Sequence, residues 1–162
     1  MTDVITIRCS EPYDLAPLDE LFARSYPKLL KADYAPSVLV TALPLISKAQ
    51  PALLRSGTYY VAETADGTLI GAGGWTRGRR RGSADIRHVI TDASQVRRGV
   101  GRAIVARVFE EARAAGVTAL QCKSTRTAVP FYEAMGFKAL DAFEMELRPG
   151  IHFPAIQMHR SL

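Results

Sequence analysis

Two spacings of apolar residues alternate along this 162-residue chain and predict its secondary structure. Apolar residues at every second position indicate a β-strand with one buried face, and a recurrence at every third or fourth position indicates an amphipathic helix. Strands are predicted in seven segments: 4–8, 58–63, 69–75, 84–91, 117–123, 138–147 and 155–160. Helices are predicted at 14–26, at 36–48 and after Gly101, where one face carries Ile104, Val105, Val108, Phe109 and Ala112.

Local signals set several of the element boundaries. Asp14 is the predicted N-cap of the first helix, which we expect to end near Tyr26, and Pro44 predicts a kink in the second. Asp66 followed by glycine predicts a hairpin turn. Gly116 predicts the C-cap of the third helix.

The strand at 84–91 is predicted to be central. Unless a bulge intervenes, its alternation separates two sets of side chains: Asp85, Arg87, Val89 and Thr91 on one face, and Ile86, His88 and Ile90 on the other. Three glycines in the preceding strand predict a bulge or the close approach of another backbone: Gly71, Gly73 and Gly74. The succession of strand, helix and strand between 84 and 123 predicts a right-handed parallel crossover, whereas the last two strands predict an antiparallel pair. Together they predict an α/β (α+β) protein with a mixed sheet.

Composition narrows the class of protein. The chain is 48% apolar, enough for a sizeable core, and its length predicts one domain over residues 1–162. The first ten residues have no long apolar run, and the longest uncharged run, 34–47, is too short to cross a bilayer, so we expect neither a signal peptide nor a membrane span. Cys9 and Cys122 lie far apart and predict free thiols in a reducing cytoplasm. The three histidines have no metal-ligand spacing.

The net charge of +5 indicates either a basic surface without a specific partner or a field that captures an anionic ligand. The segment 76–83 contributes four arginines, Arg77, Arg79, Arg80 and Arg81. Because no aromatic residues are interleaved with them, we expect a solvated loop that repels cationic substrates or attracts acidic ones. Nucleic-acid binding is the minor alternative.

A glycine-containing turn at 95–102 connects the central strand to the third helix. A helix N-terminus presents unpaired N–H groups and the positive end of the helix dipole. Gly99 and Gly101 lack a Cβ, so a bulky anion can approach the backbone. Arg97, Arg98 and Arg102 add positive charge. The turn therefore predicts a phosphate site. It has neither the third small residue of a Rossmann fingerprint nor the Gly-Lys-Ser/Thr run of a Walker loop.

Two segments carry a resemblance to a known family. The turn Val96-Arg97-Arg98-Gly99-Val100-Gly101 resembles the acyl-CoA-binding motif Gln/Arg-x-x-Gly-x-Gly/Ala of the Gcn5-related N-acetyltransferase (GNAT) superfamily. Val96 replaces the usual Gln or Arg, which removes one side-chain contact but keeps the backbone N–H groups. The segment from Ala128 to Phe137 resembles the family's Ala-x-x-Phe-Tyr-x-x-x-Gly-Phe signature on a short helix after the fifth strand, with Thr127 where Asn is common. The resemblance implies the GNAT fold, with the fourth and fifth strands splayed apart.

The resemblance also implies site residues. The pyrophosphate of CoA would be held by residues 96–102, namely Val96, Arg97, Arg98, Gly99, Val100, Gly101 and Arg102. The Val89 N–H would hold the acetyl carbonyl oxygen, and the backbone of Thr91 would pair with the pantetheine. Thr127 and Phe131 would complete the cofactor site.

Three residues are candidates for proton transfer. Asp85 lies 14 positions before Gly99, where the histone-acetylating branch of the family has its general base, and it is either the base or an ion-pair partner of an arginine. His88 is the rival base if its ring does not face the core. Tyr132 is the expected acid for the CoA thiolate, with core packing beside Phe131 as the alternative.

The resemblance implies a function: transfer of the acetyl group of acetyl-CoA to a primary amine in a ternary complex, with no metal. A small-molecule amine is favoured as the acceptor over a peptide or protein. The alternative from another class is a non-catalytic acyl-CoA-binding or regulatory protein. A homodimer is possible because members of the family often dimerise.

Overall fold

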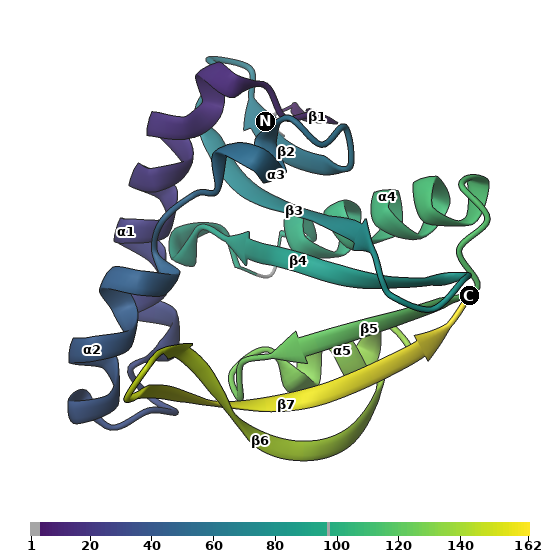
Figure 1. Cartoon of the computed structure of the whole chain (residues 1–162). Coiled ribbons are helices and arrows are strands. Elements are labelled where there is room, and N and C mark those ends of the chain that lie inside the picture. The colour runs from purple at the N-terminus through teal and green to yellow at the C-terminus, as the bar shows by residue number, and fades with distance from the viewer. Residues whose placement is uncertain (1–3, 97) are drawn as a thin grey trace.

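The computed structural model describes residues 4–96 and 98–162. In these residues seven strands form one mixed sheet in the order β1-β2-β3-β4-β5-β7-β6 (Figure 1). The strands are β1 (Ile5–Cys9), β2 (Tyr59–Thr64), β3 (Leu69–Arg77), β4 (Ser83–Thr91), β5 (Ala119–Ser124), β6 (Lys138–Arg148) and β7 (Ile151–Ser161). The helices are α1 (Leu15–Leu30), α2 (Pro36–Ile46), α3 (Pro51–Leu54), α4 (Val100–Ala114) and α5 (Val129–Ala134), with two short 3-10 turns, Pro12–Asp14 and Ala93–Gln95. All seven predicted strands are present, and so is the parallel β4–β5 crossover through α4.

The helices form a layer on each face of the sheet (Figure 1). On one face α1, α2 and α3 bury a core that includes Leu18, Leu21 and Phe22, all fully inaccessible. On the other face α4 and α5 bury a second core that includes the predicted α4 residues Val105 and Val108. The apolar face of α4 is therefore buried against the sheet, as the spacing of its residues predicted.

The boundaries of α1 differ from the prediction. The helix continues through Pro27 to Leu30, because Tyr26 and Leu30 are buried and their packing offsets the backbone hydrogen bond that proline cannot donate. Asp14 occupies the N-cap position, but its side chain does not cap the helix. Its buried carboxylate instead accepts two bonds of 2.9 Å from the Arg8 guanidinium, and it accepts the Glu11 N–H at 2.7 Å.

Glycines in β3 allow α4 to lie close to the sheet. A Cβ on Gly71 would come within 2.7 Å of the Val100 side chain, and one on Gly73 within 2.9 Å of Ile104. Both distances are too short for carbon atoms. At these two glycines the neighbours are side chains of the first half of α4 rather than another backbone. The predicted close approach of a backbone occurs at Gly74, where a Cβ would lie 2.6 Å from the Tyr59 Cα.

A β-bulge interrupts β4 opposite Gly73. Gly74 of β3 pairs with Arg87 and Ala72 pairs with Ile90, so two residues of β4, His88 and Val89, lie opposite a single glycine. His88 has a φ of +51°, in the left-handed region that side chains other than glycine rarely adopt.

The bulge changes which side chains share a face. Regular alternation would have put Val89 and Thr91 with Asp85; instead Val89 packs in the α4 core, and the Thr91 hydroxyl lies against Gly101 at the start of α4. His88 packs with Asp85 and Arg87 on the α1–α2 face. The alternation predicted for a strand without a bulge is thus wrong beyond Arg87. The extra residue shifts each later side chain of β4 to the opposite face of the sheet.

The strands β4 and β5 pair along only part of their length. Their parallel register runs from Ser83 opposite Ala119 to Asp85 opposite Gln121. Beyond that point β5 continues to pair with β7, as far as Ser124, while β4 continues to pair with β3, as far as Thr91. Figure 1 shows the two strands diverging. The expected splay is present, and it opens the sheet at its centre.

Candidate active site

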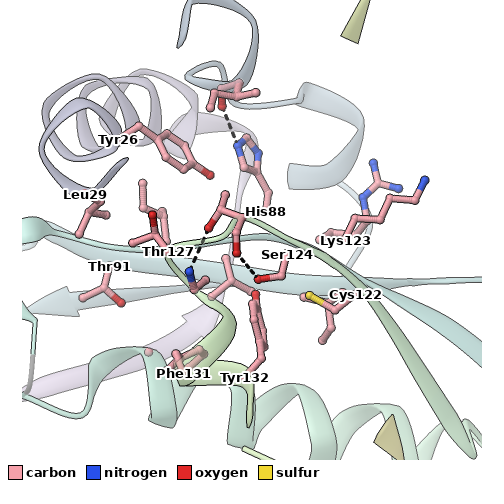
Figure 2. Close-up of a pocket in the computed structure, with 18 of the residues that line it drawn as sticks. Tyr26, Leu29, His88, Thr91, Cys122, Lys123, Ser124, Thr127, Phe131 and Tyr132 are labelled. Carbon is pink, nitrogen blue, oxygen red and sulfur yellow. Dashed lines mark hydrogen bonds between the residues drawn. The ribbon is translucent and has the colours of Figure 1, made fainter. Parts of the chain in front are cut away.

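A cleft of about 1010 Å³ occupies the gap between β4 and β5. Its walls come from α1, α2, the start of α4, α5 and the β6–β7 hairpin as well as the two strands. Figure 2 shows Tyr26 and His88 on one side of the cleft and Phe131, Tyr132 and Cys122 on the other. The cleft therefore connects the two faces of the sheet.

Most of the site residues predicted from the sequence line this cleft. They are Asp85, His88, Val89, Thr91, Val96, Gly99, Val100, Gly101, Arg102, Thr127, Phe131 and Tyr132. Arg98 is exposed outside the cleft lining, and its guanidinium bonds to the Gln95 side chain. Arg97 lies outside the described residues.

The glycine turn gives one end of the cleft the shape of an anion site. Gly99 has a φ of +78°, which lets the chain turn directly into α4. The Ala103 N–H donates to the Gly99 carbonyl at 3.0 Å, so the three preceding N–H groups, those of Val100, Gly101 and Arg102, have no carbonyl within the helix. A Cβ on Gly101 would lie 3.1 Å from the Thr91 hydroxyl oxygen and 3.3 Å from the Phe131 ring, so a glycine keeps this corner open.

His88 is held by both helices of the α1–α2 layer. Its ring centroid lies 4.3 Å from that of Phe22 and 5.9 Å from that of Tyr26, which it stacks against. Its Nε2 donates to the Ile46 carbonyl at 2.9 Å, which leaves the lone pair on Nδ1. Burial lowers the pKa of His88 below its ordinary value near 6.5, because the charged ring loses hydration; the Ile46 carbonyl opposes this shift and Arg87 adds to it. The imidazole is therefore neutral at pH 7.

A cluster of four polar side chains, called the polar group here, occupies the floor of the cleft where β4 and β5 part. Asp85 pairs in register with Gln121, and in a parallel pair the next residues on the same face are Arg87 and Lys123. All four line the cleft. The sequence analysis singled out only Asp85 for chemistry. The alternation of polar Gln121 and Lys123 with apolar neighbours was visible, but its relation to Asp85 required the register of two distant strands.

Tyr132 and Cys122 form the opposite wall. The Tyr132 side chain is buried and lies edge-on to Phe131 and to Phe137, with ring centroids 5.2 and 5.3 Å away. Burial raises the pKa of the phenol well above its ordinary value of 10, and the neighbouring Cys122 thiol raises it further. Burial likewise raises the pKa of Cys122 to about 12, although its hydrogen bond with Tyr132 opposes the shift. Both groups are therefore protonated at neutral pH.

A set of hydrogen bonds between distant loops, called the clasp here, lies beside the cleft at Thr127, which lines it; the clasp consists of Asp33 and Tyr34 with Arg126, Thr127 and Pro154. The Tyr34 hydroxyl accepts the Arg126 N–H at 2.8 Å and donates to the Pro154 carbonyl at 2.7 Å. The Thr127 hydroxyl donates to the Asp33 carboxylate at 2.6 Å. The sequence analysis missed these contacts, since they join residues more than 90 positions apart.

Within residues 4–96 and 98–162, no group of three or more His, Cys, Asp or Glu side chains has the arrangement of a metal site. Both cysteines are free thiols, Cys9 exposed and Cys122 buried. No helix in the described part of the chain combines the length and apolar character needed to cross a bilayer.

Comparison with known proteins identifies the fold and the family. Three solved structures share the fold. PaiA N-acetyltransferase from Thermoplasma acidophilum, in complex with coenzyme A, is 18% identical, with a TM-score of 0.78 over 98% of this chain and 99% of that one. A GCN5-related N-acetyltransferase from Rhodopseudomonas palustris is 21% identical, with a TM-score of 0.80 over 100% and 99%. Ard1 from Thermoplasma volcanium is 18% identical, with a TM-score of 0.70 over 98% and 97%.

Among curated protein sequences, none matches this chain significantly. The model of the acetyltransferase (GNAT) domain matches residues 33–158, which include every site residue predicted from the sequence. The chain therefore belongs to the GNAT family of acetyl-CoA-dependent acetyltransferases.

Proposed function

We propose that the protein transfers the acetyl group of acetyl-CoA to the amine of a small molecule, by direct attack while both substrates are bound. The observation that carries this proposal is the cleft, which runs from the glycine turn through the gap between β4 and β5 to the polar group around Asp85. It gives the donor and the acceptor separate ends of one continuous space.

The donor end matches acetyl-CoA in charge and shape. The N–H groups of Val100, Gly101 and Arg102 and the dipole of the 15-residue helix α4 favour a pyrophosphate. The pantetheine would pass between β4 and β5, along the backbone of Thr91. Val89 has no paired residue in β3 or β5, so its N–H is a candidate donor to the thioester oxygen, as in an oxyanion hole.

The proposed reaction needs one base and one acid. The acceptor attacks the thioester carbon as the neutral amine, after an ammonium form has lost one proton to solvent. As the C–N bond forms the nitrogen must lose a further proton, and Asp85, half-buried at the acceptor end, would take that proton directly or through a water. The C–S bond then breaks, and Tyr132 would protonate the CoA thiolate. His88, bound to Ile46 and stacked on Tyr26, is assigned the positioning of the bulge rather than proton transfer.

The walls of the acceptor end favour a small molecule over a peptide. The clasp joins the α1–α2 loop to the loop after β5, and Leu147 and Phe153 of the β6–β7 hairpin pack into the α1–α2 core. An extended peptide needs a trough that is open at both ends. With these contacts on its sides, the acceptor end takes a compact amine more readily than a chain.

Acetyl-CoA should stabilise the parent protein, with a melting temperature higher by on the order of 5–10 °C at about 100 times its Kd. Gly101→Glu should abolish this shift, because its side chain would enter the corner between Thr91 and Phe131 and its charge would repel the phosphates. Ala106→Glu adds the same charge to an exposed position of α4 outside the cleft and should retain the shift. Differential scanning fluorimetry measures all three proteins, and equal shifts in the two variants would exclude the turn as the phosphate site.

Asp85→Asn should reduce turnover by roughly 10²-fold, since it removes the positioned base while keeping the size of the side chain. Stopped assays of free CoA thiol measure the rate, and the acetyl-CoA melting shift shows that the donor site is intact. A variant with the parent's rate at every pH would show that another group or water accepts the proton.

Tyr132→Phe should reduce turnover by roughly 10- to 10³-fold, the usual effect of a positioned acid, and should change the affinity for acetyl-CoA little. Because burial holds the phenol pKa well above 10, the parent's rate should show no loss from phenol ionisation up to pH 10. Rates measured between pH 6 and 10 test both points. A falling limb near pH 9 that vanishes in the variant would contradict the assigned burial of the hydroxyl, and an unchanged rate would leave Tyr132 as a packing residue.

A further inference from the structure

Positive charge is in excess at the acceptor end of the cleft. Lys48, Arg87 and Lys123 line this end, from the α2–α3 connection, β4 and β5 respectively. Among the described residues that line the cleft, Asp85 carries the sole carboxylate. Three cations and one anion therefore line the end of the cleft where the amine is proposed to bind.

Arg87 is the most constrained of the three cations. Its side chain is half-buried, and its two terminal nitrogens contact neutral groups at long range: Nη1 lies 3.4 Å from the Thr76 hydroxyl and Nη2 lies 3.4 Å from the Gln50 side-chain oxygen. None of the ion pairs within residues 4–96 and 98–162 includes Arg87. A partly desolvated guanidinium with such weak partners favours binding of an external anion, and its planar fork matches a carboxylate.

The donor would not supply that anion. The phosphates of CoA are placed at the glycine turn beside Arg102, and the thioester that reaches the acceptor end is neutral. An anion that binds Arg87 would therefore come from the acceptor. The same cations disfavour a protonated amine, so an acceptor without an anionic group would be repelled in its ammonium form.

We infer that the acceptor is an amino carboxylate, whose carboxylate binds the fork of Arg87 with help from Lys123 while its amine points to Asp85. Arg87 and Lys123 follow the last β4–β5 pair, Asp85 opposite Gln121, by two residues each and so flank the point where the strands part. Figure 2 shows the Lys123 side chain extending away from Cys122 and Tyr132. Arg87 is thus a specificity-determining residue. This inference rests on the proposed amine acetylation.

The experiment compares α-amino acids with their carboxamides as acceptors, using release of CoA thiol and the mass of the acetylated product. The carboxamide has the less basic amine, so a preference for the acid cannot come from the fraction of neutral amine. We expect kcat/KM to be at least 10-fold higher for the acids. Arg87→Gln should reduce this ratio by roughly 10- to 10²-fold, mainly through KM of the acid, because a charge-assisted hydrogen-bonded pair is lost.

Three further variants distinguish the loss of a positive charge in the cleft from a general loss of charge or of folded protein. Lys123→Gln should lower the same ratio less, since Lys123 is exposed, and Arg87→Lys should restore part of it. Arg79→Gln removes a charge from an exposed position outside the cleft and should leave the ratio at the parent's value. The acetyl-CoA melting shift verifies that each variant is folded.

Two results would overturn the inference. Equal kcat/KM values for acids and amides, or a ratio that Arg87→Gln leaves unchanged, would contradict carboxylate binding by Arg87. Either result would leave the proposed amine acetylation unaffected. Acetyl transfer to no member of either series, by a protein that still binds acetyl-CoA, would remove the amine acceptor and this inference with it.

Discussion

The β-bulge at His88 is the constraint on which the site depends. A histidine in the left-handed region costs of order 1–3 kcal/mol, so the surrounding contacts have to hold it there. Three contacts do so: the ring donates to the Ile46 carbonyl, it packs against Phe22 and Tyr26, and its own carbonyl accepts the Tyr59 hydroxyl at 2.7 Å. They tie β4 to α1, α2 and β2, so the bulge is fixed by the first half of the chain.

The bulge determines which groups meet. By inverting the alternation of β4 it places Asp85 and Arg87 on the α1–α2 face, and Val89 and Thr91 on the face of α4 and the glycine turn. The pairing of β4 with β5 ends at Asp85, three residues before the bulge. A substrate in the cleft can contact the N–H groups at the start of α4 on one face of the sheet and the Asp85 carboxylate on the other. This geometry is what direct transfer between two bound substrates requires.

The elements and the donor end were predictable from the sequence because their signals are local. The turn at 99–101 is marked by its own glycines, and the α4 stripe by its spacing. The glycines of β3 predicted a bulge or a close approach, but they did not indicate that the bulge would fall in β4 at His88, where it is held by residues of other elements. Similarly, the first helix was expected to end near Tyr26, but it continues through Pro27 to Leu30, which is buried.

The acceptor end was less predictable, because its residues come together through contacts between distant segments. The segment 76–83 suggested an influence of arginines on acidic substrates, yet the arginine that lines the cleft is Arg87, inside a strand. Its relation to Lys123 arises from the register of β4 against β5, and that of Tyr34 to Arg126 from the contact of the α1–α2 loop with the loop after β5. These are long-range contacts, which periodicity in one segment cannot indicate.

A crystal structure of the protein with CoA tests the central claim most directly. The account predicts that His88 keeps its positive φ, that the pantetheine lies between β4 and β5, and that the pyrophosphate contacts the N–H groups of Val100, Gly101 and Arg102. CoA bound outside this gap, or β4 running straight through His88 and paired with β5 along its whole length, would contradict it.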